Sequence, residues 1–206
     1  MKLDIPVIGI LRGIDPGFFG EVMAVAFAGG LQAIEVTINT AGAEQIVSRC
    51  RAVVPPGKLL GMGTVRNLEE AKAAADAGAM FMVSPNLDVR VIEYANSQGV
   101  PIIAGALTPT EVYAAWQAGA DMVKVFPCGS LGGPRYIREL LGPFDHLPLV
   151  AVGGVTAANL AEYFAAGARA VGVSTSLFGS EALRSRDVGQ IGAQVKKFIE
   201  QCPAKG

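Results

Sequence analysis

A chain of 206 residues, of which 51% are hydrophobic and only 17% are charged, is long enough to bury a large core and is too apolar for a disordered protein. The net charge is −1 and no basic cluster occurs, so nucleic acid and anionic membranes are poor candidate partners. No apolar run approaches the roughly 18 residues that cross a bilayer.

Short apolar segments recur along the chain, and their starts are about 20 to 27 residues apart, the length of one strand–helix unit. Amphipathic stretches lie between them. The segments predict strands, in chain order, at Val7–Leu11, Ala33–Asn39, Leu59–Val65, Phe81–Ser84, Ile102–Ala106, Met122–Phe126, Leu149–Val152 and Ala170–Ser174.

Helices are predicted between these strands, for example at Leu68–Ala77 and Pro109–Ala118. Asn67 and Thr108 stand before them as N-cap residues, and each predicted helix carries glutamate in its first turn. Several of the helical stretches end on a glycine, in "AFAGG", "ADAGA", "WQAGA" and "FAAGA", which is typical of helix C-termini.

Strands that are too apolar for either face to contact water indicate a parallel sheet covered by helices. Eight such units in one domain close most economically into a (β/α)8 TIM barrel, which we expect to span residues 1–206 as a single domain. The alternative is a doubly wound open sheet, and the missing G-x-G-x-x-G after the first strand weakens it.

Cysteine and histidine are too scarce for several common kinds of site. Cys50, Cys128 and Cys202 lie far apart with no C-x-x-C pair, which favours reduced thiols in the cytoplasm over disulfides. The single histidine, His146, is expected in a surface loop; a Ser-His-Asp triad would require it, and His-rich zinc sites cannot be built. Cys128 follows a strand near the expected pocket, but a buried small hydrophobic side chain is the simpler interpretation.

One lysine interrupts an apolar strand. Lys124 stands between valines in "MVKVFP", where an unpaired ammonium group would cost several kcal/mol. In "AIEVTIN", Glu35, Thr37 and Asn39 alternate with apolar residues, so the polar set shares one face of its strand. Because the outer face packs on helices, the polar face must line the barrel, and Lys124 is the natural partner for Glu35.

Two interpretations of this pair stay open. The first is a structural ion pair that fills the barrel. The second is that burial lowers the pKa of Lys124 and leaves a neutral amine, which attacks carbonyl carbons and forms Schiff bases. Glu35 opposes that lowering because a nearby anion favours the ammonium form, and it can also transfer protons.

Other polar residues and glycines stand where predicted strands end, and catalytic groups of such barrels come from those ends. Arg12 can hold a carboxylate bidentately, or it can be a rim arginine paired with an acid. Thr64 follows glycines that let a ligand approach the backbone. The segments "VGGV" and "VGVSTS" follow the pattern of phosphate-binding loops after the seventh and eighth strands. Ordinary tight turns can have the same glycine-rich sequence and are the alternative.

Taken together and in order, these motifs resemble the 2-keto-3-deoxy-6-phosphogluconate aldolase family, which includes 2-keto-3-deoxy-6-phosphogalactonate and 4-hydroxy-2-oxoglutarate aldolases. The likeness covers nearly the whole chain and rests on "ILRG", "GGLQAIEVTINT", "GMGTV", "FMVSPN", "GALTPTE", "KVFP", "GGP", "GPF" and "GGV". It implies a metal-independent class I aldolase that needs no cofactor, folds as a (β/α)8 barrel and assembles as a homotrimer in the cytoplasm.

The resemblance also implies roles for particular residues. Lys124 matches the Schiff-base lysine, and Glu35 matches the glutamate that shuttles protons. The expected substrate is a phosphorylated 2-keto-3-deoxy sugar acid, cleaved between C3 and C4 into pyruvate and D-glyceraldehyde 3-phosphate. The matching substrate-binding positions are Arg12, Thr64, Pro85, Gly153, Gly154, Ser174 and Thr175.

This sequence departs from many phosphogluconate aldolases at two positions. It has Asn39 where they have an arginine, and Val152 where they have a threonine. Both changes look like the phosphogalactonate branch, and Ser174 stands where relatives often have glycine. Three other functions remain as alternatives: a 4-hydroxy-2-oxoglutarate aldolase, a sugar-phosphate isomerase or decarboxylase in which Lys124 forms no imine, and a non-catalytic sugar-phosphate binding protein.

Overall fold

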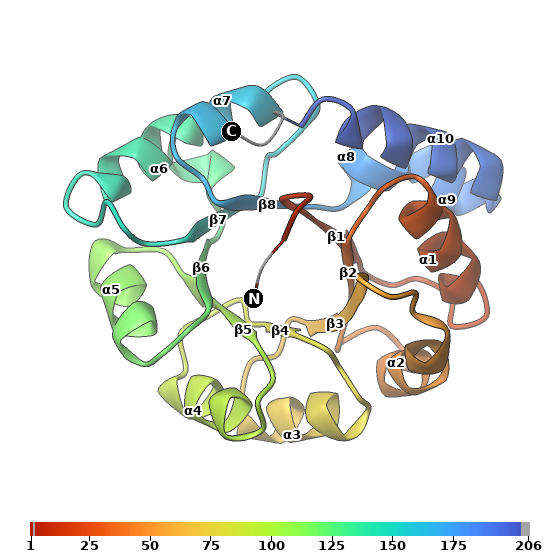
Figure 1. The fold of residues 1–206 in the computed structure, drawn as a ribbon, viewed down its shortest axis with the longest axis horizontal. Helices are drawn as coiled ribbons and strands as arrows, with labels where there is room; N and C mark the ends of the chain where they lie inside the picture. Colours follow the sequence, from red (N-terminus) through yellow and green to blue (C-terminus); the bar gives the residue numbers. More distant parts are fainter. Residues whose placement is uncertain (2, 203–206) are drawn as a thin grey trace.

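The strands form a closed parallel barrel in the computed structural model, which describes residues 1 and 3–202. Neighbours follow chain order from β1 to β8, and β8 pairs with β1 to close the ring (Figure 1). The predicted (β/α)8 TIM barrel is therefore confirmed, and the open-sheet alternative is wrong. The strands are β1 (Val7–Leu11), β2 (Ala33–Thr37), β3 (Leu59–Gly63), β4 (Met82–Val83), β5 (Ile102–Ala106), β6 (Met122–Val125), β7 (Leu149–Val152) and β8 (Ala170–Val173).

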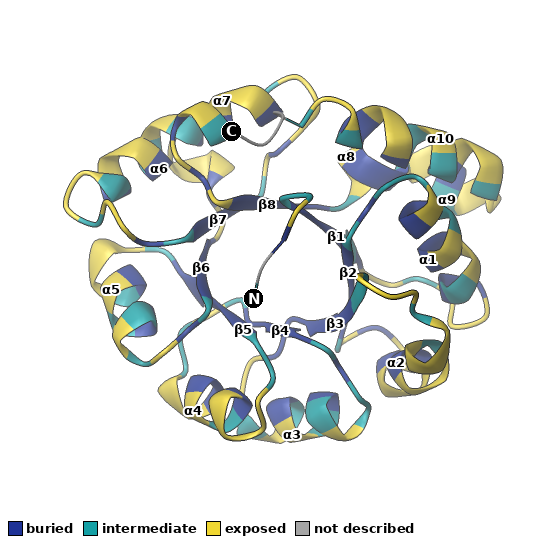
Figure 2. Cartoon of the chain, viewed as in Figure 1, coloured by how far each residue is buried: buried dark blue, intermediate teal, exposed yellow. Residues whose placement is uncertain are grey.

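Helices surround this barrel as an outer ring, and their outward faces are the exposed part of the molecule (Figure 2). The α-helices are α1 (Phe19–Ala28), α2 (Ala43–Cys50), α3 (Leu68–Asp76), α4 (Val89–Ser97), α5 (Pro109–Gln117), α6 (Pro134–Leu141), α7 (Leu160–Ala165), α8 (Thr175–Phe178), α9 (Ser180–Ser185) and α10 (Val188–Ile199). Two short 3-10 helices, η1 (Arg51–Val53) and η2 (Gly129–Leu131), lie in connecting segments.

The helix ends follow the predicted local chemistry. Asn67 accepts a hydrogen bond from the Glu70 backbone N–H at the start of α3. Thr108 and Glu111 form a reciprocal capping box at the start of α5. Both helices end one residue earlier than predicted, at a C-cap alanine followed by a glycine with positive φ.

Several strands end earlier than the sequence predicts. β1, β5 and β7 have the predicted bounds, whereas β2, β3, β6 and β8 are shorter at their carboxyl ends, by one or two residues each. The reason is that these end residues leave the ladder and build the mouth of the barrel: Thr64, for example, has a φ of +60°, which no strand residue adopts. β4 is shorter at both ends, although the flanking Phe81 and Ser84 still bond to neighbouring strands.

Two apolar clusters hold the fold together. The larger one fills the space between strands and helices, and the smaller one fills the inside of the barrel. Alternation along each strand separates them: Ala33 belongs to the inner cluster and Ile34 to the outer one. Leu3 joins the inner cluster, and the Met1 amino group pairs with Asp121 just before β6, so the N-terminal segment covers the amino ends of the strands.

Across residues 1 and 3–202, every helix falls short of the length or the hydrophobicity that a bilayer crossing requires.

Candidate active site

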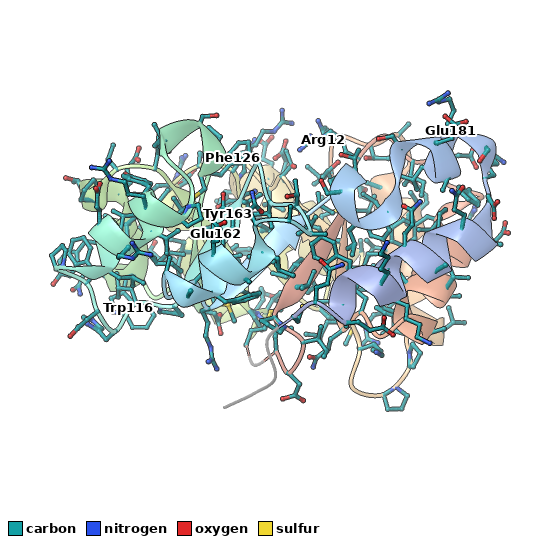
Figure 3. All side chains as sticks on the ribbon, turned by 90° about the horizontal axis from the view of Figure 1, so that it is seen from above. Arg12, Trp116, Phe126, Glu162, Tyr163 and Glu181 are labelled. Carbon is teal, nitrogen blue, oxygen red and sulfur yellow. The ribbon has the colours of Figure 1, made fainter. Side chains whose placement is uncertain are left out.

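A cavity of about 390 Å³ opens at the carboxyl ends of the strands. In the side view, Arg12 and Phe126 mark this end of the barrel, and Trp116 lies near the opposite end (Figure 3). The structure brings together every residue that the sequence predicts for the site. The cavity is lined by Arg12, Glu35, Thr64, Pro85, Lys124, Gly153, Gly154, Ser174 and Thr175, among others.

Lys124 projects into this cavity from β6, where every residue is buried. Its exposed fraction is 5%, and its Nζ lies 5.0 Å from the centroid of the Phe126 ring. Burial lowers the pKa of Lys124 from its usual 10.5; the negative charge of Glu35 opposes this, and Arg12 adds to it. The environment therefore enlarges the fraction of neutral, nucleophilic amine.

Glu35 lies on β2 and is 1% exposed. Gly63 on β3 makes room for it, because a β-carbon at that position would collide with the carboxylate. Its Oε2 atom has no hydrogen-bond partner among the residues that the structure describes. Burial raises the pKa of Glu35 from 4.5 to about 7, although Lys124 and Arg12 both pull it down. The carboxyl group can thus gain and lose a proton near neutral pH.

Glu35 and Lys124 influence each other without direct contact. Among the described residues there is no hydrogen bond or salt bridge between them, yet each charge opposes the effect of burial on the partner's pKa. Of the two interpretations left open by the sequence, the structural ion pair that fills the barrel is therefore not found among the described residues. Both side chains line the same cavity, where a reacting molecule can contact each of them.

Arg12 is held at the cavity mouth by two side chains. One of its terminal nitrogens donates to Asn39 Oδ1 at 3.0 Å, and the other donates to Thr64 Oγ1 at 3.2 Å. Thr64 has a φ of +60°, a conformation that costs a β-branched residue roughly 1–2 kcal/mol. The alternative in which Arg12 pairs with an acid is not found among the described residues. Asn39, predicted inside the strand, instead lies exposed beyond its end.

Pro85 forms part of the wall next to Lys124, and the segment that carries it is firmly held. Ser84 Oγ donates to the carbonyl of Asn86 at 2.8 Å and accepts from the Gly105 N–H at 2.9 Å. A side chain at Gly105 would collide with the Pro85 backbone. Ser84 and Gly105 together fix the position of Pro85.

The opposite wall is built from backbone. Gly153 and Gly154 follow β7 with φ values of +95° and +81°, a region that favours glycine. Ser174 and Thr175 come from the junction of β8 and α8. Both segments that the sequence predicts for a phosphate line the cavity, one after β7 and the other where β8 leads into α8. Successive backbone N–H groups in such turns form concave sites for anions.

Sequence reasoning missed Phe126 as a cavity residue. It is 39% exposed and lines the mouth beside Lys124. The signal was available, because Phe126 stands two residues after Lys124 and period two places both on the same face. Cys128 is fully buried and does not line the cavity, and His146 is exposed, as the sequence predicts for both.

In the part of the chain that the structure describes, His, Cys, Asp and Glu side chains do not gather in groups of three or more that could hold a metal ion.

Comparisons with known proteins point in one direction. A family model described as KDPG and KHG aldolase matches residues 5–194. The chain is 39% identical over 175 residues to a probable 2-dehydro-3-deoxy-6-phosphogalactonate aldolase of Rhizobium meliloti (strain 1021), a match that covers 84% of this chain and 82% of that one.

Two further proteins match almost the full length of the chain. The 2-dehydro-3-deoxy-6-phosphogalactonate aldolase of Escherichia coli (strain K12) is 34% identical over 198 residues, 95% of this chain and 96% of that one. A solved structure described as native KDPGal superposes with a TM-score of 0.90 at 31% identity, over 98% of this chain and 96% of that chain.

Proposed function

Because the chain belongs to the KDPG and KHG aldolase family of metal-independent lyases, we propose that Lys124 forms a Schiff base with a 2-keto-3-deoxy-6-phospho sugar acid and cleaves it into pyruvate and D-glyceraldehyde 3-phosphate. The observation that carries the proposal is the pairing in one cavity of a buried amine with lowered pKa and a buried carboxyl group with a pKa of about 7.

The reaction begins when the Lys124 amine adds to the C2 carbonyl. The N–C2 bond forms, the carbonyl oxygen takes up a proton, and loss of water leaves a protonated imine. Glu35 supplies and removes protons in these steps. Its carboxylate then takes the proton of the C4 hydroxyl, the C3–C4 bond breaks, and the electron pair moves into the imine. The aldehyde leaves, and the remaining enamine is protonated at C3 and hydrolysed to pyruvate.

Both ends of the substrate have a place in the cavity. Arg12 and Thr64, joined by a hydrogen bond at the mouth, hold the carboxylate end. The N–H groups around Gly153–Gly154 and Ser174–Thr175 hold the phosphate, and Pro85 bounds the wall beside the amine. Anchoring both ends places C3 and C4 between Lys124 and Glu35, which contributes much of the barrier reduction in such reactions.

Reductive trapping tests the mechanism. Pyruvate with borohydride is expected to modify Lys124, detected by mass spectrometry of the peptide that carries it, and Lys124→Ala is expected to abolish both labelling and cleavage. Lys58 provides a matched control, because burial also lowers its pKa but it lies outside the cavity. Full activity of Lys124→Ala, or labelling that requires Lys58, refutes the proposal.

Among related substrates, the phosphogalactonate compound is favoured. Val152 lines the cavity where many phosphogluconate aldolases have a threonine, and two of the most similar relatives are named for phosphogalactonate. The order of substrate preference is measured by initial rates with three compounds: the galactonate-derived phosphate, the gluconate-derived phosphate and 4-hydroxy-2-oxoglutarate. A preference for the last, which has no phosphate, contradicts the role assigned to the glycine loops.

The assembly and location of the protein are also part of the proposal. We expect residues 1–206 to form a single domain, and the protein to be a homotrimer in the cytoplasm; the resemblance of the motifs supports this. Sedimentation equilibrium at several protein concentrations tests the trimer.

A further inference from the structure

The loop after β7 is tied to the loop that follows the Lys124 strand. The Cys128 N–H donates to the Val152 carbonyl, and the Gly129 N–H donates to the Gly153 carbonyl, both at 2.9 Å. Gly129 packs directly against the loop, since a β-carbon there would lie 2.8 Å from the Gly153 oxygen. These contacts fix two consecutive carbonyl groups from one side.

The third carbonyl of this loop is held by a side chain. Asn159 Nδ2 donates to the Gly154 carbonyl at 2.9 Å, and Asn159 Oδ1 accepts from the Thr156 N–H at 2.8 Å. The two polar atoms of one amide thus bridge the beginning and the end of the loop. Asn159 does not line the cavity itself.

Fixing these carbonyls also fixes the N–H groups that follow them. In a trans peptide, the C=O of one residue and the N–H of the next lie in one plane and point in opposite directions. Pinning the carbonyls of residues 152, 153 and 154 therefore directs the N–H groups of Gly153, Gly154 and Val155. None of these three N–H groups donates to an acceptor within the described residues, and all three residues line the cavity.

This direction matters because the loop carries no cationic side chain. Among the described residues that line the cavity, the charged side chains are Arg12, Glu35 and Lys124, and none belongs to the segments after β7 and β8. An anion placed at this wall is held by N–H dipoles, whose strength depends on their alignment.

We propose that Asn159 is a positioning residue: its side-chain amide orients the Gly154–Val155 peptide so that the loop after β7 binds the substrate phosphate. The inference rests on the proposed function, which places the phosphate at this loop. Asn159 acts through the Gly154 carbonyl and the Thr156 N–H and takes no part in the chemistry at Lys124.

The test compares two leucine variants. Asn159→Leu removes both hydrogen bonds, whereas Asn96→Leu removes a similar bond, from an asparagine Nδ2 to the Gly119 carbonyl at 3.1 Å, near the amino ends of the strands. Asn159→Leu is expected to raise KM for the phosphorylated substrate by about tenfold or more, as for misaligned hydrogen bonds to a charged group. Asn96→Leu is expected to leave KM unchanged.

A half-reaction separates positioning from general damage. Exchange of the pyruvate methyl protons with deuterated water requires imine formation but no phosphate, so Asn159→Leu is expected to exchange at the wild-type rate. An unchanged KM, an equal fall in exchange, or the same effect in Asn96→Leu overturns the inference.

Binding of inorganic phosphate, followed by ³¹P NMR, keeps the inference testable if the proposed aldol chemistry fails. If the wild-type protein does not exchange the pyruvate methyl protons, that result counts against the proposed function. Equal phosphate affinity in wild type and Asn159→Leu counts against Asn159.

Discussion

Lys124 and Glu35 are each placed where the charged form is disfavoured. Burial lowers the pKa of the amine and raises that of the acid to about 7, so the two values move toward each other. Neutral amine and a carboxyl group that titrates near pH 7 are the forms that imine chemistry uses at physiological pH. The same burial costs stability, and that cost can be measured.

The rate of cleavage is expected to depend on the ionisation of Glu35. In the proposed mechanism the Glu35 carboxylate accepts the C4 hydroxyl proton, and this form accumulates as the pH rises through its pKa of about 7. We therefore expect kcat to rise with pH across this range, and Glu35→Gln to lower kcat by about 10²–10⁴ and remove the rise. Steady-state pH profiles of both proteins check this. If kcat of Glu35→Gln rises with pH at the same midpoint, the rise in kcat belongs to another titrating group.

Stability is expected to show the opposite pH dependence. Because the pKa of Glu35 is higher in the folded protein than its ordinary 4.5, the folded state binds the proton more tightly. Folding free energy is therefore lost as the pH rises from about 4.5 through about 7. Glu35→Gln removes this loss.

The free energy of unfolding of Glu35→Gln is expected to exceed that of wild type by roughly 2 kcal/mol at about pH 8. At about pH 5 the two values are expected to lie closer together. Without the carboxylate, the one cause that raises the pKa of Lys124 is removed, and burial and Arg12 lower that pKa further. Urea unfolding at the two pH values measures the difference. A variant less stable than wild type at pH 8 contradicts the argument.

At the scale of the elements, glycines on the strands decide what the inside of the barrel can hold. In each case a β-carbon would collide with a group that belongs to the core or to the site. The pairs are Gly61 with Phe81, Gly63 with Glu35, Gly105 with the Pro85 backbone, and Gly172 with Val152. Small residues on one strand thus permit large ones on its neighbour.

Gly63→Ala tests this arrangement. The added methyl group meets the Glu35 carboxylate, which must shift, so we expect kcat to fall by about tenfold or more, while imine trapping slows but still labels Lys124. Gly20→Ala in α1 is the matched control. Its β-carbon would have only Cys50 Sγ nearby, at 3.8 Å, and a helical alanine is expected to add about 0.5–1 kcal/mol of stability without changing kcat. Wild-type kcat in Gly63→Ala shows that the position of Glu35 is not critical.

At the scale of the whole molecule, the protein has almost no net charge. With a formal charge of −1, it has little long-range field to attract an anionic substrate. Binding then depends on short-range contacts inside the cavity, where salt screens poorly.

We expect kcat/KM to change by less than about threefold between roughly 0.01 and 0.15 M sodium chloride, a range over which the Debye length falls from about 30 to 8 Å. Chloride is used because sulfate and phosphate compete for the anion site. A fall of about tenfold or more indicates electrostatic steering by surface charges.

Much of the fold and the site follows from local rules. Period two in β2 separates Glu35 from Ile34, and the lone lysine of β6 predicts a polar group inside the barrel. The carboxyl ends of parallel strands lie at the same end of the barrel, so the site residues could be expected to converge there.

What sequence could not predict depends on contacts between distant segments. The hydrogen bonds from Arg12 to Asn39 and to Thr64 join residues that are 27 and 52 positions apart, and no local pattern connects them. The space that the Glu35 carboxylate occupies likewise depends on Gly63 of the neighbouring strand.

The two backbone hydrogen bonds between residues 128–129 and 152–153 bear on which substrate lengths the cavity accepts. The loop that follows the strand bearing the amine is hydrogen-bonded to the loop assigned to the phosphate, so backbone contacts fix the position of one relative to the other. If the proposed function holds, we expect a phosphorylated keto acid one carbon longer or shorter to be cleaved more slowly, because it fits this fixed span less well. The length of the substrate's carbon chain, as well as its functional groups, then contributes to specificity.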